Sequence, residues 1–480
     1  MRIIPALSLF SLISLFITGC RSSALTDPWA YAPKNSYRVW TPEVLEQRKI
    51  SYIEPNGDLN VPRPDESLSL GDLFDIGLRN NPSTSLSWQE AREAAASYSV
   101  SLAPYLPSLG FTAGLTSVRE GFVVTQGSSL SVYTSYGPQV ALNYLIWDSG
   151  QTRTNAEYYF QTLQQLNWDH NETLQTVMQG VAKAYYEHLY AKEMLVALDQ
   201  DLLNAEQSYQ AACDKVLSGI FNETEKMQAK TNYLQKKVQV TGEIATVQNS
   251  FVELLSVLGI PCDVIFSLGS FPQTPPIDLF DMTSDELIAL AKAKRPDYQG
   301  AKAAVLAQES FLKNAKAQVL PEISLAATGG QAWYTNGFTD NGDYTVILNL
   351  TFPIFSGFYY VNNIRKAESQ LKTSVAHLRS SELGLVHDVK TSHNTFVMAK
   401  SQLVDAKNYL ESAQIEFKAM LERYQMGIVT ILDLLSSEAF LSDARASYVK
   451  AQKVYFMSII DISFATGLLT SACPWTKENS

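Results

Sequence analysis

The sequence predicts a mainly α-helical protein that also carries β-strands suited to a lipid bilayer, built from two copies of one plan. Three observations predict this fold class: a repeat that recurs about half a chain later, two very long stretches without proline, and paired segments in which apolar residues alternate with small or polar ones. A hydrophobic period near seven predicts long packed helices, and a period of two predicts strands.

The repeat is clearest in two short segments. Residues 103–114 read APYLPSLGFTAG, and residues 317–329 read AQVLPEISLAATG, 214 positions later. Further along the chain, Gly219 and Gly427 are equivalent and lie 208 positions apart, so loops between the two points differ in length. An internal repeat this long indicates duplication into a pseudo-symmetric molecule.

Each copy is predicted to contain a short helix, a helix ended by Leu-Pro, two strands, a long helix, a glycine turn and a return helix. The first copy spans 67–261, with strands at about 106–118 and 137–147, a long helix at 151–217 and a return helix at 224–258. The second copy spans 281–469, with strands at about 320–332 and 343–354, a long helix at 358–426 and a return helix at 431–466. Residues 262–280 form an equatorial linker, and residues 470–480 form a C-terminal tail.

The long helices show a coiled-coil pattern. In the second copy, large residues recur at seven-residue steps, with small residues between them: Val389, Phe396, Leu403, Leu410, Phe417 and Tyr424. Alternating large and small seam residues allow helices to approach closely. At 1.5 Å per residue each helix would be about 100 Å long, roughly three times the hydrocarbon thickness of a bilayer. The heptads alone also fit a soluble helical bundle.

The two strand pairs predict a membrane-embedded sheet. Strands of about ten residues with one apolar face suit a transmembrane barrel, although a half-buried sheet in a soluble domain shows the same alternation. Four strands cannot span a bilayer alone, because their edges would leave backbone groups unpaired in lipid, so an obligate oligomer is predicted. Pro107 and Pro321 mark the helix–strand junctions, since proline lacks the amide that a continuing helix uses.

The N-terminus predicts an exported protein. Arg2 and the apolar stretch after it are typical of a signal peptide, here residues 1–19. The small residues before Cys20 resemble a bacterial lipobox, so Cys20 is expected to carry a covalent lipid at the start of an extended segment, residues 20–66. A plain signal peptide followed by a chance cysteine is the alternative. Cys262 and Cys473 could form a disulfide in such a protein.

Composition and motifs exclude several classes of function. Net charge is −11 with no basic cluster, which excludes a nucleic-acid surface, and 46% hydrophobic content excludes a disordered chain. No metal-ligand spacing, phosphate loop or nucleophile set occurs, so no enzyme activity, metal or cofactor other than the lipid is expected. His188 falls on the helix seam, and the other histidines are expected to be solvated.

An ordered set of motifs then carries a resemblance. These are the two Leu-Pro junctions, FPIFSG at 352–357, YQMG at 424–427 and TILDLL at 430–435. Over residues from about 68 to 469 the chain resembles the TolC family of outer-membrane efflux proteins, and the lipobox makes it similar to the lipoprotein branch. The resemblance implies a homotrimer with a twelve-stranded β-barrel in the outer membrane of a Gram-negative-type bacterium. A helical barrel would continue across the periplasm, toward a periplasmic adaptor protein and an inner-membrane pump or exporter.

The resemblance also implies a periplasmic gate at the hairpin tips. It points to Tyr424 and Asp433 beside Gly427, and to Glu225 beside Gly219. A second acid that the family often carries one turn later is Ser436 here. The two carboxylates could instead simply occupy the first turns of their helices, where the helix dipole favours acids.

The function implied is a passive, gated exit duct for efflux or type I secretion. A non-conducting periplasmic scaffold or adhesin anchored by Cys20 is the alternative, but a lipid anchor would make membrane strands unnecessary.

Overall fold

The structure is a computed structural model of the whole chain, and it describes residues 29, 32–38, 40, 67–124, 127–217, 223–269, 271, 282–335 and 341–469. The expected signal peptide, Cys20, Gly219, Cys473 and the tail lie outside these residues. The chain forms two compact units. One unit contains residues 1–34, 90–167 and 300–379, and the other contains residues 35–89, 168–299 and 380–480.

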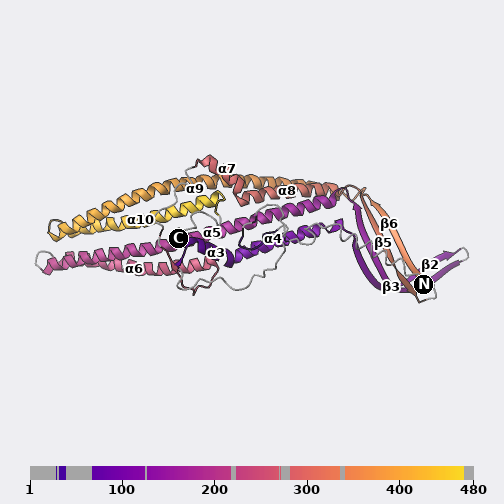
Figure 1. Cartoon of the computed structure of the whole chain (residues 1–480), viewed down its shortest axis with the longest axis horizontal. Helices are drawn as coiled ribbons and strands as arrows, with labels where there is room; N and C mark the ends of the chain where they lie inside the picture. The colour runs from indigo at the N-terminus through magenta and orange to yellow at the C-terminus, as the bar shows by residue number, and fades with distance from the viewer. Residues whose placement is uncertain are drawn as a thin grey trace. The chain divides into compact units, whose positions relative to one another are not determined.

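The elements follow the duplicated plan. The first copy contains β1 (Ser67–Leu68), α3 (Leu70–Asn80), α4 (Pro82–Ser101), β2 (Ser108–Val124), β3 (Gly127–Trp147), α5 (Gln151–Leu217) and α6 (Glu223–Leu258). After β4 (Ser267–Leu268), the second contains α7 (Ser284–Lys294), α8 (Pro296–Ala317), β5 (Glu322–Tyr334), β6 (Asn341–Thr351), α9 (Tyr359–Gln425) and α10 (Ile431–Ala465). Both ends of α9 lie 208 positions after those of α5. In both views α6 returns beside α5, and α10 returns beside α9 (Figure 1).

The first unit contains one antiparallel sheet in the order β2-β3-β5-β6. Cross-strand register aligns the apolar positions of all four strands: one row runs Leu109, Leu142, Ala327 and Val346, and the next runs Phe111, Val140, Gly329 and Tyr344. Directly opposed residues of antiparallel strands point to the same face. The alternation in the sequence therefore becomes one continuous apolar face, on which Phe111 remains 71% exposed.

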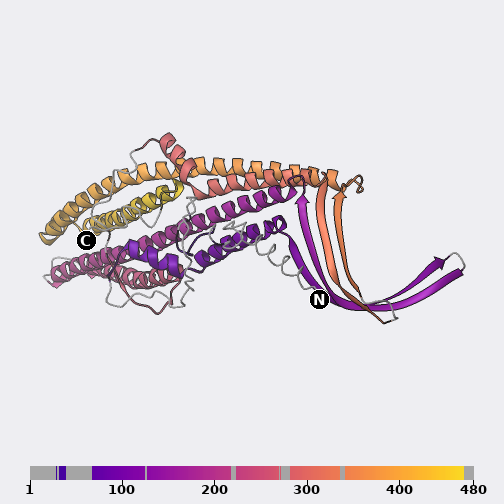
Figure 2. The same cartoon turned by 45° about the vertical axis from the view of Figure 1, so that its right-hand side comes forward.

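The first hairpin is longer than the sequence indicated. Strand β2 extends to Val124, beyond the expected end near 118, and β3 begins at Gly127 instead of near 137. Figure 2 shows this hairpin continuing past β5 and β6. Residues 117–136 are rich in serine, threonine and glycine, which interrupt the apolar alternation, but a strand ladder needs only backbone N–H and C=O groups. The hydrophobic pattern therefore predicted strands β2 and β3 that are too short.

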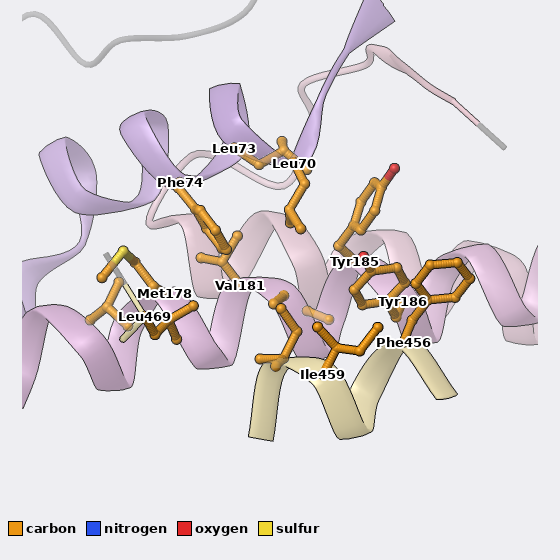
Figure 3. Packing of buried hydrophobic residues seen from close by; sticks show 14 of the residues in the cluster. Leu70, Leu73, Phe74, Met178, Val181, Tyr185, Tyr186, Phe456, Ile459 and Leu469 are labelled. Atoms are coloured by element: carbon orange, nitrogen blue, oxygen red, sulfur yellow. The ribbon is translucent and has the colours of Figure 1, made fainter. Parts of the chain in front are cut away.

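The main apolar core of the second unit joins elements from both copies. Phe74 of α3 points toward Val181 of α5 (Figure 3), and Leu73 belongs to the same buried cluster. In the same cluster, Tyr186 of α5 stacks on Phe456 of α10, with ring centroids 5.3 Å apart. Burying each large apolar side chain contributes about 1.5–3 kcal/mol, so this cluster fixes α3 and α10 on α5.

The return helices of the two copies end in the same way. Gly259 ends α6 and Gly467 ends α10, each with φ of +72°, and the next residue donates back across the turn in a Schellman motif. Each glycine lies against the end of the short helix of its own copy. A Cβ at Gly259 would be 2.7 Å from Asn80 O, and one at Gly467 would be 2.9 Å from Arg295 Cα. Glycine is therefore required twice by both conformation and space.

Several large residues of the heptad seam predicted for the long helices are buried. Val389, Phe396 and Tyr424 are all buried in the second unit. His188 is buried as well, with its Nδ1 3.0 Å from Ser250 Oγ. The expectation that the remaining histidines are solvated is wrong for His170, which is fully buried between Ser87 Oγ and the carbonyl of Arg38. Burial lowers the pKa of His170 to about 4, so the ring is neutral at physiological pH.

Among the described helices, none is both long enough and apolar enough to cross a bilayer.

Candidate functional site

The turn between α9 and α10 is fully ordered by backbone and capping bonds. Gly427, with φ of +79°, ends α9: its N–H donates to Tyr424 O, and the N–H of Ile428 donates to Arg423 O. Thr430 then begins α10 as its N-cap. A left-handed glycine followed three residues later by a capping threonine makes a tight reversal of the chain.

Asp433 closes the capping box of α10. Its Oδ2 accepts hydrogen bonds from the Thr430 N–H at 2.9 Å and from the Thr430 hydroxyl at 2.7 Å. These bonds hold the pKa of Asp433 below its ordinary value, because they stabilise the carboxylate. The side chain is otherwise exposed. The structure thus gives Asp433 the local helix-start role that the sequence left as an alternative, and leaves its charge facing solvent.

Tyr424 lies inside the chain near the same turn. It is 0% exposed and belongs to a small apolar cluster from α5, α6, α9 and α10, including Ala212, Ala229, Phe417, Leu434 and Ala444. Burial raises the pKa of Tyr424 to about 12, and the nearby Glu225 carboxylate adds to the shift. Through this cluster the Tyr424 side chain packs against both helical hairpins. Because its pKa is raised, the Tyr424 hydroxyl stays protonated at physiological pH.

Lys215, in the last turn of α5, holds Tyr424 in two ways. Its Nζ donates to the Tyr424 carbonyl and lies 3.8 Å from the centroid of the Tyr424 ring. The ammonium is buried, and desolvation lowers the pKa of Lys215 while Glu225 opposes that shift. A desolvated cation–π contact contributes about 2 kcal/mol. Sequence reasoning missed Lys215, and its one visible signal was a basic residue in the last turn of α5, matched by Arg423 in α9.

Two of the predicted gate residues therefore lie together and one does not. Glu225, in the first turn of α6, approaches Tyr424 and Lys215 closely enough to shift both their pKa values. Asp433 is hydrogen bonded to Thr430 instead. The expected turn at Gly219 lies outside the described residues.

A second, larger polar cluster joins the hairpins further from the tips. Asp201 of α5 is buried and accepts from Arg445 Nη1 of α10 at 2.5 Å and from the Ser442 hydroxyl. Lys236 of α6 lies 3.5 Å from Asp201 and donates to Ser442 Oγ at 2.6 Å. A buried carboxylate with two cations has its charge and its lone pairs satisfied.

Glu438 of α10 completes this cluster. Its carboxylate accepts from Asn232 of α6 at 2.7 Å and from Ser208 of α5 at 3.0 Å, and it is buried. Burial raises the pKa of Glu438 despite these bonds. Asp201, Lys236, Arg445 and Glu438 together tie α10 to both helices of the first hairpin, and none of the four was predicted from the sequence.

The junction prolines directly precede their strands. Pro107 lies before Ser108 of β2, and Pro321 lies before Glu322 of β5, with its carbonyl accepting from Ser149 Oγ at 2.7 Å. Exposed aromatic rings surround the sheet end of these junctions: Tyr105, Trp147, Phe355, Phe358 and Tyr359. Such a belt is typical of a membrane–water boundary.

The described residues contain no group of three or more His, Cys, Asp or Glu side chains arranged for a metal ion. Cys213 and Cys262 are free thiols, and the proposed partner of Cys262, Cys473, is outside the described residues. The described residues of this region form three features: a lysine–tyrosine contact near the helix tips, a buried ion cluster further from the tips, and an exposed acid at the turn between α9 and α10.

Comparison with known proteins agrees with this architecture. The chain matches the family described as "Outer membrane efflux protein" over residues 73–260 and 287–468. It is 23% identical to the pyoverdine export outer membrane protein OpmQ of Pseudomonas putida, covering 84% of this chain and 86% of that one. It is 22% identical to the probable outer membrane lipoprotein SilC of Salmonella typhimurium, covering 91% and 93%.

Solved structures give the same fold. The outer membrane protein VceC of Vibrio cholerae superposes with a TM-score of 0.73 at 17% identity, covering 83% of this chain and 96% of that one. The family match includes both copies of the duplicated plan, from α3 to the end of α6 and from α7 to the end of α10. The chain belongs to the outer membrane efflux protein family.

Proposed function

We propose that this chain is the outer-membrane exit duct of a tripartite efflux or type I secretion system, and that it conducts passively. One observation carries the proposal: the apolar rows of β2, β3, β5 and β6 align in register on one exposed face, while the long helical hairpins of the same chain pack into their own core. A face of this kind needs lipid, and helices of about 100 Å suit a periplasmic passage.

Closure of the duct requires other copies of the chain. Strands β2 and β6 are the two edges of the described sheet, and open edges in hydrocarbon would leave N–H and C=O groups unpaired. In a homotrimer, four strands from each copy would form a twelve-stranded barrel, in which the N–H and C=O groups of β2 and β6 pair with those of the neighbouring copies. The energy for export would come from an inner-membrane pump reached through a periplasmic adaptor, so the chain needs no enzyme chemistry of its own.

Cys20 is proposed to carry a lipid that anchors the N-terminal segment in the outer membrane. The likeness to SilC, a probable outer membrane lipoprotein, supports this assignment. A single acyl chain binds a membrane only weakly, so the lipid would assist a barrel and not replace it.

The gate is proposed to be closed by contacts between the hairpin tips. The bond from Lys215 to the Tyr424 carbonyl joins the end of α5 to the end of α9 within one chain. Opening would separate these ends and expose Tyr424, which is the residue buried between them. Glu225 lies beside the link and is placed to receive Lys215 when the link breaks.

Purified, lipidated protein in planar bilayers is expected to give discrete single-channel steps. Replacing Lys215 by methionine should raise the mean conductance several-fold, because loss of about 2 kcal/mol shifts a closed–open equilibrium by roughly thirtyfold at most. The matched control is Lys226→Met, which removes a partly exposed cation at the same tip, one that pairs with Glu223 at 3.4 Å and not with Tyr424.

Each outcome of this recording has a clear meaning. Absence of steps from a protein that inserts and remains folded would favour the scaffold alternative. Equal conductance for Lys215→Met and wild type would exclude the lysine–tyrosine link as part of the gate.

Asp433 is expected to bind cations at the tip entrance, since its charge faces solvent in each copy. Asp433→Asn keeps an acceptor for Thr430 but removes the charge, so divalent cations should block the variant at concentrations about tenfold higher. Because the pKa of Asp433 is lowered, the block of wild-type channels should persist on mild acidification. Identical block in both proteins would leave Asp433 with only its capping role.

A further inference from the structure

A cavity of about 620 Å³ lies between the start of α5 and the end of α8, within the unit that contains the sheet. The two helices that form it are held together. Asn314 Nδ2 of α8 donates to the carbonyl of Gln151 of α5 at 2.8 Å, and the rings of Tyr158 and Phe311 pack with centroids 5.5 Å apart. In both views these helix ends lie side by side next to the sheet (Figure 1).

Three cationic side chains line the part of this cavity that is nearest to the sheet. Arg153 is in the first turn of α5, shortly after β3, and Lys313 and Lys316 are in the last turns of α8, shortly before β5. All three are exposed, and none forms an ion pair or a hydrogen bond with another residue that the structure describes. Cations gathered without a counter-charge favour an anion such as a phosphate.

Two acids line the part of the cavity that is further from the sheet. Glu157 lies four residues beyond Arg153 in α5, and Glu309 lies seven residues before Lys316 in α8, so the steps along the helix axes are about 6 Å and 10 Å. Helix α5 runs away from the sheet and α8 runs toward it, so both steps lead away from the sheet. The cavity is therefore positive near the sheet and negative beyond.

The duplication shows that the fold itself does not require these cations. The offsets of 208 for the long helices and 214 for the preceding helices give the equivalents of the three cationic positions in the other copy: Val361, Ser99 and Leu102. None of these equivalents is charged. The three cations therefore belong to this cavity alone and not to the repeated plan.

The positive part of the cavity lies at the aromatic belt. Burial and the Asp148 carboxylate raise the pKa of Tyr105, and the Arg153 guanidinium is near enough to oppose them. Tyr105 is one of the exposed rings of the belt, and Leu320, which directly precedes the Pro321 junction, lines the cavity and is 51% exposed. The cavity thus begins at the level expected for the membrane–water boundary.

We propose that this cavity binds the headgroup of a zwitterionic phospholipid that carries a primary amine. The three cations receive the phosphate, as basic pockets between helices do at membrane surfaces. The ammonium group, two carbon atoms beyond the phosphate, extends toward the two acids, and Leu320 lies at the side of the acyl chains. The order of charge from the membrane outward is the same in the lipid and in the cavity. This inference rests on the proposed membrane position of the sheet and assigns a lipid to it.

Native mass spectrometry of the full-length lipidated protein in detergent tests the assignment. The probes are phosphatidylethanolamine, phosphatidylglycerol and phosphatidylcholine with the same acyl chains. Phosphatidylethanolamine is expected to bind about fivefold more tightly than the other two, which corresponds to one exposed ion pair. Phosphatidylglycerol has no ammonium group, and the quaternary ammonium of phosphatidylcholine has no N–H to donate to a carboxylate.

Two double variants separate the two parts of the cavity. Arg153→Gln with Lys316→Gln should weaken the binding of all three lipids about tenfold, because two phosphate contacts are lost. Glu157→Gln with Glu309→Gln should leave phosphatidylglycerol binding unchanged and remove the preference for phosphatidylethanolamine. The matched controls are Lys366→Gln and Glu368→Gln, an exposed cation and an exposed acid of α9 that do not line the cavity. All four positions of the double variants are exposed, so the thermal midpoints should stay unchanged.

A soluble probe distinguishes a membrane lipid from a free metabolite with the same headgroup. Phosphoethanolamine without acyl chains is expected to displace the lipid only at far higher concentration, since it lacks the contact with Leu320 and the apolar face. Displacement at equal concentration would overturn the lipid as the ligand.

The remaining outcomes separate this inference from the proposed function. A native trimer that conducts but binds the three lipids equally, or that loses binding equally in the α9 controls, would overturn the lipid site alone. A protein that is monomeric and non-conducting in detergent and bilayers would overturn the proposed function as well.

Discussion

Replacing Asp201 with alanine is expected to lower the free energy of unfolding of the helical unit by about 3–5 kcal/mol. The carboxylate is buried between Lys236, Arg445 and the Ser442 hydroxyl, and removing it leaves two cations in a poorly hydrated site without their shared anion. Loss of a buried charge partner costs far more than loss of a surface ion pair.

The measurement is hydrogen exchange in α5, α6 and α10, together with the thermal midpoint of the helical circular dichroism signal. Asp199→Ala, an exposed acid on the same helix, is the control and should change the stability by less than about 0.5 kcal/mol. Substituting Asp201, Lys236 and Arg445 together by apolar residues should recover much of the loss. Equal effects of Asp199→Ala and Asp201→Ala would contradict the role of the cluster.

Gly467→Ala is expected to be the second most damaging change, at about 2–4 kcal/mol. A left-handed alanine alone costs about 1 kcal/mol, and here the new Cβ would also lie 2.9 Å from backbone atoms of Lys294 and Arg295 at the end of α7. The helix ends cannot separate without uncovering the core beside them, so the strain is not easily relieved.

Gly427→Ala is the matched control for this prediction. Its φ of +79° is equally left-handed, but nothing lies within 4 Å of the position of a new Cβ. It should therefore show only the conformational cost of about 1 kcal/mol. Both variants are compared by the thermal midpoint of the same helical signal. If Gly467→Ala lowers the thermal midpoint no more than Gly427→Ala does, then the end of α7 moves away from the new Cβ at little cost in free energy.

Much of the fold could be predicted because the strongest signals are periodic and local. The absence of proline and the seven-residue seam from Val389 to Tyr424 defined α9 to within a residue or two. The Leu-Pro pairs located the starts of β2 and β5 similarly. The far half of the first hairpin was not predicted, since its ladder is held by backbone groups and serine, threonine and glycine interrupt the apolar alternation of its sequence.

The candidate site was predictable only in part. Tyr424 and Glu225 could be located from a motif and a repeat offset, and they do approach each other. Lys215 and Asp201 could not, because a charged residue on a long helix gives the same pattern whether it faces water or a buried partner on another hairpin. His170 was placed wrongly for the same reason: its partners, Ser87 and Arg38, come from distant parts of the chain.

The unequal strand lengths have a consequence for the rim of the duct. β2 has 17 residues and β6 has 11, so a seam between β6 of one copy and β2 of the next can pair at most 11 residues and leaves six of β2 without a neighbour on that side. Backbone N–H and C=O groups without a partner are tolerated only in water, so these six residues of β2 must lie outside the hydrocarbon of the membrane. In the proposed homotrimer, three such hairpins would therefore extend beyond the hydrocarbon at the mouth of the duct.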